Sequence, residues 1–338
     1  MAKAKIDIYQ SITDKIIKKL EEGVKPWFKP WNAENAAGKI SRPLRHDFTP
    51  YNGINVLNLW MTAEEKGYSA PVWMTFKQDK DLGGMVKKGE KASLSVFAKT
   101  FTKTEEDENT GEEVEKNIPF MKGYSVFNVE QIDGLPAKYY ELAKEPEITP
   151  EQRIEEIEQF FLNTGAEINE GGNKAYYAIG ADKIQIPPFV AFEDAESFYS
   201  TLAHETTHWT RHPSRLDRDL GRKKWGDEGY AMEELVAELG SAYIGADLGL
   251  APDVREENAA YIQSWLKVLK EDKRAIFTAA AHAQRAAELL HDYQENPQPR
   301  PEIAEELEEV AELDQHQAPE DENPAIENMH QLDIFEPF

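Results

Sequence analysis

The stretch Tyr199-Ser-Thr-Leu-Ala-His-Glu-Thr-Thr-His-Trp209 decides what kind of domain the second half of this chain forms. It places His204 and His208 four residues apart, and on a helix this spacing sets two imidazoles on one face. Both rings can then bind one metal ion. Zinc accepts imidazole nitrogen and, in catalytic sites, keeps a position for water. The pattern therefore predicts a zinc site in which Glu205 is the general base for a metal-activated water that attacks a peptide bond.

A second acidic stretch supplies the remaining protein ligand. Met232-Glu-Glu-Leu-Val-Ala-Glu238 carries Glu234 and Glu238 on one face of a predicted helix, beside an apolar stripe. Carboxylates next to a core require a cation, so we predict Glu234 as the third ligand, with Glu233 as the alternative. Glu238 is predicted to accept a hydrogen bond from the outer N–H of a ligand histidine. The competing interpretation is that these acids are ordinary surface charges.

His212 follows the second ligand by another four residues, but Pro213 directly after it indicates that the helix ends there. The longer HExxHxxGxxH pattern also fails, because Arg211 and Ser214 stand where it requires Gly and His. We therefore predict that His212 supports or packs near the site without binding the metal.

Two features near the site suggest how a peptide substrate is held. Tyr230 lies one turn before Glu234 and is predicted to donate to the oxyanion, although a partly buried aromatic residue is the alternative. Residues 176–186 alternate in polarity and predict one strand, ended by Pro187. Its edge is a place where a peptide can add as an extra strand.

The periodicity of apolar residues predicts an α+β protein. An amphipathic helix opens the chain between Ile8 and Leu20, and short strands and glycine turns follow as far as residue 131. The acidic segment 105–116 is predicted to be a solvated hairpin tip. Further helices are predicted over 151–163, 194–211, 228–247 and 255–293, the last broken near Asp272. We divide the chain into a small mixed α/β N-terminal domain (1–135), a linker (136–150), a mainly helical domain with a small sheet (151–295) and a disordered acidic tail (296–338).

Composition limits the chemistry. The 338 residues include no cysteine, which excludes disulfides, thiolate metal sites and cysteine nucleophiles, and no Gly-x-Ser-x-Gly turn surrounds a serine. The N-terminus has no apolar signal segment and no stretch is long enough to span a membrane, so we expect a cytoplasmic protein.

The formal net charge of -25 is unevenly distributed along the chain. Residues 1–104 hold 18 basic and 11 acidic residues, whereas residues 295–338 hold 14 acidic residues and one arginine.

The basic N-terminal half interleaves aromatic and cationic residues, as proteins that bind single-stranded DNA do, because rings stack on bases while cations follow the phosphates. Gly83-Gly84-Met-Val-Lys-Lys-Gly-Glu-Lys91 adds a glycine turn whose amides can approach a phosphate. The alternative is that half or more of these aromatic residues are core. The predicted DNA contacts are Lys25, Trp27, Lys29, Trp31, Arg42, Arg45, Tyr51, Asn52, Trp73, Lys77, Lys87, Lys88 and Lys91.

Both halves resemble the ArdC-type anti-restriction proteins of conjugative plasmids and related mobile elements, over about residues 6–293. In the first half the resemblance is carried by Pro26-Trp-Phe-Lys-Pro-Trp31, Tyr51-Asn-Gly-Ile-Asn55, Trp73-Met-Thr-Phe76, the glycine turn and Tyr124-Ser-Val-Phe-Asn128 with Gln131-Ile-Asp-Gly-Leu-Pro136. In the second half it is carried by Asp182-Lys-Ile-Gln-Ile-Pro187, the two stretches quoted above and Ser214-Arg-Leu-Asp217. The resemblance implies a single-stranded-DNA-binding domain joined to a zincin-like metallopeptidase domain, and a role in protecting incoming DNA from restriction. The acidic insert at 105–116 and the tail beyond 296 depart from it.

Near the end of the tail, Gln331-Leu-Asp-Ile-Phe335 resembles the short peptide by which bacterial proteins dock on the replication sliding clamp. Leu332, Ile334 and Phe335 would fill an apolar pocket while Gln331 orients the peptide, with Asp333 between them. A sticky apolar end without a partner is the alternative.

The sequence thus favours an anti-restriction, gluzincin-like metallopeptidase with Zn²⁺, or another divalent ion such as Mn²⁺, that binds single-stranded DNA. The alternative is a non-catalytic anti-restriction protein that sequesters or mimics DNA and holds a structural metal.

Overall fold

The computed structural model describes residues 7–27, 41–106, 113–140, 150–221, 228–250 and 259–299. Its part up to Gln298 forms one compact unit. Within the described ranges, no helix has both the length and the apolar character needed to cross a membrane. The acidic tail from residue 300 onward, with the clamp-like peptide, lies outside the described residues.

The N-terminal half combines helices with a small antiparallel sheet. Asp7 caps the first helix by accepting a hydrogen bond from the Gln10 amide at 3.1 Å, and the apolar face of this helix is buried as its spacing predicts. The elements are α1 (Ile8–Glu21), α2 (Ile54–Lys66), β1 (Trp73–Thr75), α3 (Phe76–Asp81), β2 (Met85–Val86), β3 (Ser93–Glu106), β4 (Glu113–Asn128), η1 (Val129–Gln131), β5 (Ile132–Asp133) and η2 (Ala137–Tyr139).

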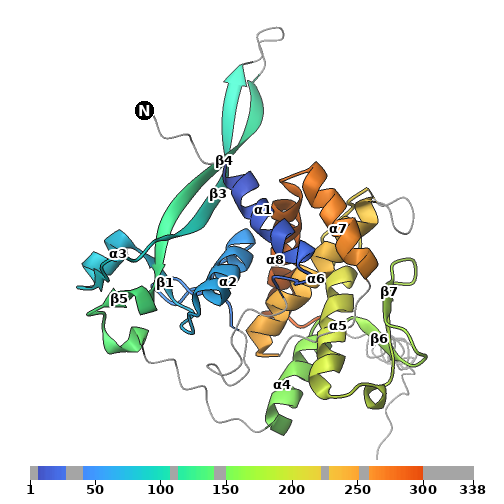
Figure 1. Cartoon of the computed structure of the whole chain (residues 1–338). Coiled ribbons are helices and arrows are strands. Elements are labelled where there is room, and N and C mark those ends of the chain that lie inside the picture. Colours follow the sequence, from blue (N-terminus) through green and yellow to red (C-terminus); the bar gives the residue numbers. More distant parts are fainter. Residues whose placement is uncertain are drawn as a thin grey trace, which may run out of the picture. The chain divides into compact units, whose positions relative to one another are not determined.

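Strands β3 and β4 form a long antiparallel hairpin, with β1 on the far side of β4 (Figure 1). The short strands predicted from the runs 93–97 and 124–129 fall on this longer hairpin, apart from Val129, and residues 107–112 of the predicted tip lie outside the described residues. Helix α2 covers the outer edge of β3. Asn55 both donates to the Val96 carbonyl and accepts from its amide at 2.7 Å, and Asn58 donates to the Leu94 carbonyl at 2.6 Å. These amides take the place of a further strand.

The C-terminal half packs helices on a three-stranded sheet in the order β6-β8-β7, in which β6 and β8 are parallel and β7 and β8 antiparallel. The predicted helices are found with small shifts at their ends, and the predicted break near Asp272 separates α7 from α8. The elements are α4 (Pro150–Leu162), β6 (Glu167–Glu170), β7 (Tyr176–Ala178), β8 (Lys183–Ile186), η3 (Phe189–Ala191), α5 (Ala195–Trp209), α6 (Glu228–Leu248), α7 (Ala259–Glu271) and α8 (Ala275–Glu295).

The prediction of one strand over 176–186 is wrong, because the chain turns between β7 and β8. Asp182, in the turn, has φ +52, a left-handed conformation that ends a strand. Its carboxylate is held by Arg215, whose Nη1 donates to Oδ2 at 2.9 Å, and by the Tyr177 hydroxyl at 2.8 Å. The alternating pattern therefore described two antiparallel strands.

Helices from both halves of the chain contribute to one apolar core. Helix α6 packs against α5 and α8, and α1 packs against α7. Polar contacts also join the two halves of the chain: Thr13 Oγ1 donates to the Lys273 carbonyl at 2.8 Å, and buried Arg42 donates to Asp247 at 2.6 Å. The mixed helix and strand architecture confirms the predicted α+β class. The predicted domain division at 136–150 stays a prediction, since 141–149 lie outside the described residues.

Candidate metal centre

Helix α5 carries both histidines, and the local sequence defines where this helix begins and ends. Asp194 caps its N-terminus by accepting from the Ser197 amide at 2.7 Å, and the helix ends at Trp209, before Pro213. Every residue from Thr201 to Trp209 is buried, so the helix lies inside the protein. His204 and His208 therefore face protein groups rather than bulk water.

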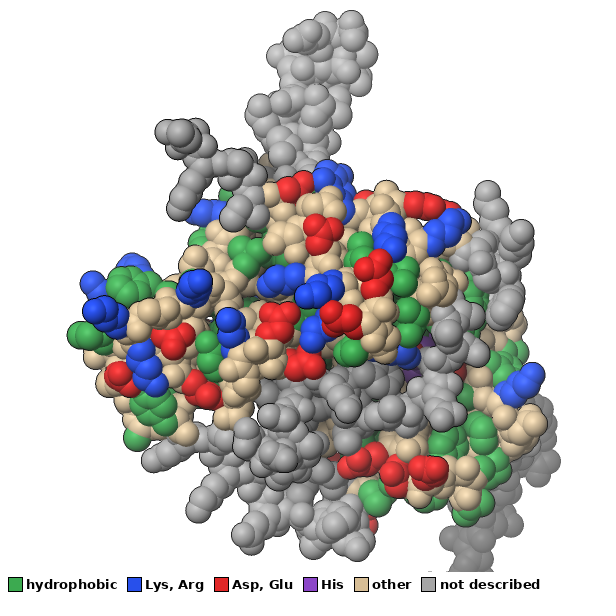
Figure 2. Space-filling model, viewed as in Figure 1, with side chains coloured by type: hydrophobic (Ala, Val, Ile, Leu, Met, Phe, Trp, Pro, Cys, Tyr) green, Lys and Arg blue, Asp and Glu red, His purple; other side chains and the backbone are tan. Residues whose placement is uncertain are grey.

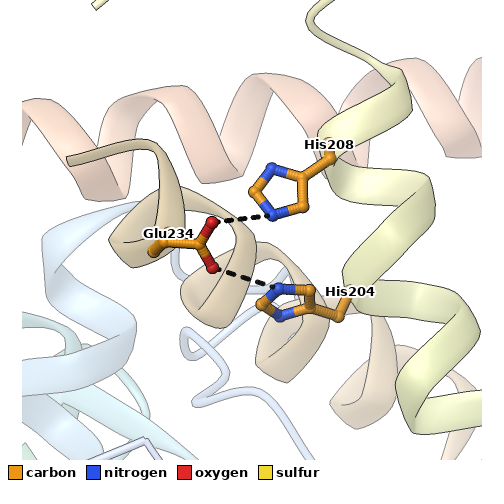
Figure 3. A group of neighbouring side chains, drawn as sticks. All are labelled: His204, His208 and Glu234. Carbon is orange, nitrogen blue, oxygen red and sulfur yellow. Dashed lines mark ion pairs between the residues drawn. The ribbon is translucent and has the colours of Figure 1, made fainter. Parts of the chain in front are cut away.

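The side chains of His204 and His208 point toward Glu234 on the neighbouring helix α6 (Figure 3). His204 Nε2 lies 3.6 Å from Glu234 Oε2, and His208 Nε2 lies 3.6 Å from Glu234 Oε1. One ligand atom from each residue lies within 4.8 Å of the other two. Two imidazole nitrogens and one carboxylate at these separations fit a divalent ion with an open position.

The outer nitrogen of His208 is held by Glu233. His208 Nδ1 lies 3.1 Å from Glu233 Oε1, and Arg218 binds both oxygens of that carboxylate, at 2.8 and 2.9 Å. Arg218 is in turn fixed by Thr210 Oγ1 at 3.0 Å and the Thr207 carbonyl at 2.9 Å. Glu233, the alternative ligand in the sequence analysis, therefore contacts the outer nitrogen of a candidate ligand ring and is not one of the three residues that converge.

The outer nitrogen of His204 faces Glu238. His204 Nδ1 lies 3.9 Å from Glu238 Oε1. The other oxygen, Oε2, accepts from Trp27 Nε1 at 3.0 Å and lies 3.5 Å from Lys25 Nζ. Each candidate ligand histidine thus has a carboxylate behind it, the arrangement that raises ligand basicity in metal sites.

Ion pairing dominates the electrostatics of the centre. Burial raises the pKa of Glu234, but the imidazoles beside it outweigh burial and hold that pKa far below its ordinary value. Burial lowers the pKa of His208, yet the charges of Glu234 and Glu233 raise it to about 10. A carboxylate that stays ionised next to a ring that attracts a proton is a site suited to a cation.

The two predicted catalytic residues lie close to the candidate ligands. Glu205 is buried on α5, directly after His204. Tyr230 lies in the first turn of α6, and its hydroxyl lies 2.9 Å from that of Tyr261. Burial, this hydrogen bond and the charge of Glu234 raise the pKa of Tyr230 well above its ordinary value, so its hydroxyl stays protonated and able to donate.

His212 lies beside the turn between β7 and β8. Its Nδ1 lies 2.7 Å from Ser214 Oγ and 4.0 Å from Asp182 Oδ2. The position of His212 near the metal stays a prediction, and the contact that the structure gives is with the turn before β8. That turn leads into a sheet whose order leaves β7 at an edge among the described strands.

Several predicted DNA contacts are buried. Arg42 bonds Asp247, Trp73 and Tyr51 lie in the core, and Lys25 and Trp27 reach Glu238. Buried rings offer no face to a base, which speaks against stacking on DNA by Trp27, Tyr51 and Trp73, and the cations Lys25 and Arg42 are paired with carboxylates of the protein. Six other predicted contacts are exposed: Arg45, Asn52, Lys77, Lys87, Lys88 and Lys91. The remaining two, Lys29 and Trp31, lie outside the described residues.

The glycine turn approaches an acid of the protein itself. A Cβ at Gly84 would lie 2.8 Å from Leu135 Cδ2 and closer still to Asp79 Oδ1. Asp79 is fully buried, and burial raises the pKa of its carboxyl. The sequence suggested that the glycine turn lets a phosphate come close to the backbone. In the structure the carboxyl group of Asp79 occupies that place next to Gly84.

An exposed face of the β3–β4 hairpin, which the sequence analysis missed, alternates aromatic and cationic residues. Phe97 pairs with Lys122 across the strands, and the rings of Phe97 and Tyr124 meet edge to face at 6.3 Å. Lys122 Nζ lies 5.0 Å from the centre of the Tyr124 ring. We call Phe97, Lys99, Phe120, Lys122 and Tyr124 the hairpin face, since their register places them on one side. Strand alternation within 93–99 and 120–124 was the available signal.

A second exposed aromatic and basic group lies on α3 and the strand after it. Figure 2 shows lysine and arginine side chains beside hydrophobic ones at the left, over α3. Phe76 is 50% exposed with Lys80 Nζ 5.0 Å from its ring centre, and Met85 is 74% exposed. Exposed rings next to lysines are therefore present in the N-terminal half, at positions other than most of those predicted.

Comparison with known proteins agrees with this geometry. Residues 6–127 match the N-terminal domain of anti-restriction factor ArdC, and residues 155–282 match a zincin-like metallopeptidase family. The crystal structure of the metal-free antirestriction ArdC protein from plasmid R388 is 48% identical, with a TM-score of 0.71, over 87% of this chain and 100% of that one. The chain belongs to the ArdC family of anti-restriction proteins. The resemblance drawn from the sequence is thereby confirmed, and this ArdC-like protein carries a zincin-like domain.

Other relatives extend the comparison. The Mn(II)-bound structure of R388 ArdC is 45% identical, with a TM-score of 0.68, over 85% of this ArdC-family chain and 98% of that protein. An uncharacterized protein of Sinorhizobium fredii, y4eC, is 40% identical over 86% of this chain and 94% of its own length. DNA primase TraC of Escherichia coli is 36% identical over 86% of this chain, which spans only 27% of TraC.

Proposed function

We propose that this ArdC-family protein is a metal-dependent peptidase that binds single-stranded DNA. One observation carries the peptidase proposal: His204, His208 and Glu234 converge within 4.8 Å, and a carboxylate faces the outer nitrogen of each histidine. A site used only for packing needs neither feature. The R388 relative crystallised with Mn(II), which supports a divalent ion of this kind in the family.

The residues divide the chemistry among them. A divalent ion, Zn²⁺ or Mn²⁺, would lower the pKa of a water and polarise the peptide carbonyl. Glu205 takes the proton from the attacking water and passes it to the leaving amine. Tyr230 donates a hydrogen bond to the carbonyl oxygen as negative charge develops on it. The edge strand β7, next to α5, pairs with the substrate backbone, and exposed Tyr176 and Ile179 contact its side chains.

Glu205→Gln tests whether the centre performs catalysis. The amide keeps the shape but cannot accept the proton, so metal content measured by mass spectrometry should match wild type while protection against restriction in cells is lost. Glu193→Gln, an exposed acid just before α5, is the matched control. Equal metal with full protection would exclude a catalytic role and favour the non-catalytic protein that sequesters DNA.

The hairpin face supports the DNA proposal. Phe97, Phe120 and Tyr124 are 45%, 42% and 39% exposed, and Lys122 lies beside the Tyr124 ring. Each stacked base contributes about 1 to 3 kcal/mol, so Tyr124→Ala should weaken binding of an oligothymidine roughly 5- to 150-fold. Tyr176→Ala, an exposed tyrosine of β7, serves as control. Equal affinities for both variants would remove the hairpin face from the DNA site.

Docking of the tail on the sliding clamp is a separate proposal that rests on residues 331–335 alone. A fluorescent peptide of residues 323–338 should bind purified clamp at micromolar concentration and lose binding on Phe335→Ala. Absence of binding by the unchanged peptide would end this proposal without affecting the metal centre.

A further inference from the structure

The segment that follows α1 reaches the candidate metal centre from the other half of the chain. Trp27 is 211 residues from Glu238 in sequence, yet its indole N–H donates to Glu238 Oε2 at 3.0 Å. Lys25 Nζ lies 3.5 Å from the same oxygen. The second oxygen of Glu238 faces His204 Nδ1 at 3.9 Å. One carboxylate therefore joins the N-terminal segment to a candidate ligand.

Burial makes this carboxylate depend on its partners. The side chain of Glu238 is 4% exposed and that of Lys25 is 9% exposed, while Trp27 is 1% exposed. A charge so far from water is tolerated only when it is paired and hydrogen-bonded. Lys25 supplies the opposite charge and Trp27 a directed donor. Both act on Oε2, while Oε1 faces His204 Nδ1.

The indole of Trp27 is itself held in place. Its ring meets the Trp265 ring edge to face at 5.6 Å, and Lys25 Nζ lies 5.4 Å from the centre of the Trp265 ring. Trp265 Nε1 donates to the Ala231 carbonyl at 3.1 Å, which anchors this group to α6. The same helix carries Glu234 and Glu238. Trp27 thus has a fixed orientation relative to the ligands.

We infer that Lys25 and Trp27 are positioning residues of the metal centre, which hold Glu238 so that it orients His204. This inference rests on the proposed metal site. The other ligand ring is oriented by Glu233 and Arg218, both from the C-terminal half. The N-terminal half thereby sets part of the metal affinity. A change in the conformation of residues 25–27 would alter the metal affinity through Glu238 and His204.

The test compares the Mn²⁺ affinity of the full chain and its variants, measured by competition with a chelator. Trp27→Phe keeps most of the ring but removes the donor, and the loss of such an orienting contact should weaken Mn²⁺ binding about 10- to 100-fold. Trp60→Phe is the matched control. Trp60 is equally buried in the same half, and its Nε1 donates to the Ser41 carbonyl at 3.0 Å. We expect the Mn²⁺ affinity of the Trp60→Phe variant to stay within about twofold of the wild-type affinity.

A double-mutant cycle separates positioning from general damage to the fold. If Trp27 acts through Glu238, Trp27→Phe should cost little further affinity once Glu238→Gln is present. Lys25→Met with Glu238→Gln gives a second cycle, which decides the question if Trp27→Phe does not fold. Additive effects in the cycle, or equal affinities of Trp27→Phe and Trp60→Phe, would overturn the inference while leaving the metal site intact. A wild-type chain that does not bind Mn²⁺ would overturn both.

Discussion

Gly240 of α6 lies directly against Thr207 of α5, one residue before His208. A Cβ at Gly240 would lie 2.8 Å from Thr207 Oγ1 and closer still to its Cγ2. The missing side chain lets the two helices approach until Glu234 lies between the two imidazoles. The separation of α5 and α6 therefore sets the size of the candidate metal centre.

Gly240→Ala should lower the free energy of unfolding by about 1 to 3 kcal/mol, because the new methyl group overpacks the contact between α5 and α6. It should also weaken Mn²⁺ binding, since the helices must separate. Urea unfolding and metal titration measure the two effects. Gly245→Ala on the same helix is the control: its Cβ would meet nothing closer than Leu250 Cβ at 3.9 Å, so it should be neutral or stabilising. Similar losses in both variants would contradict the packing argument.

Arg218→Met should destabilise the protein by about 3 to 5 kcal/mol, because it leaves the Glu233 carboxylate buried without its partner. Both side chains are only 1% exposed. Lys267→Met breaks the exposed pair with Glu228, whose side chains are 61% and 62% exposed, and should cost at most about 1 kcal/mol. Thermal and urea unfolding of both variants give the comparison. A small effect of Arg218→Met would mean that Glu233 takes up a proton or finds another partner.

The stability of the chelator-treated protein should fall as the pH rises from about 6.5 to about 10. The folded state raises the pKa of His208 to about 10 from the ordinary 6.5, so it keeps a proton that the unfolded chain releases. This stabilisation is fully present below 6.5 and is lost as the pH passes through 10, at up to about 1.4 kcal/mol per pH unit. The difference from His208→Gln, followed by urea unfolding across this range, isolates the contribution. Parallel pH profiles for the two proteins would refute it.

The parts of this site that follow from local spacing were predictable, and those that depend on distant contacts were not. His204, His208 and Glu234 each sit at helical intervals, which fix their side of a helix. The role of Glu233 depends on Arg218, whose position follows a loop beyond α5 and carries no periodic signal. Whether a tryptophan is buried in the core or exposed for contact with DNA likewise depends on its partners in the fold. Trp27 donates a hydrogen bond to Glu238, which is 211 residues away in sequence. The alternation of polarity at 176–186 does reflect β-strands, but it continues across the turn at which the chain reverses. The pattern alone therefore could not separate one strand from two.

Gly84→Ala distinguishes a structural role of the glycine turn from a role in holding phosphate. The new Cβ would lie 2.8 Å from Leu135 Cδ2 and 2.9 Å from Ile132 Cγ2, and closer still to Asp79 Oδ1. We therefore expect a loss of about 1 to 3 kcal/mol in unfolding free energy, measured by urea unfolding without any DNA. Gly180→Ala is the control, since a Cβ there meets no atom within 4 Å. If Gly84→Ala keeps full stability and loses only DNA affinity, the turn binds phosphate and the packing against Asp79 is incidental. Loss of stability with the DNA affinity of the remaining folded protein unchanged would assign the glycine to the fold.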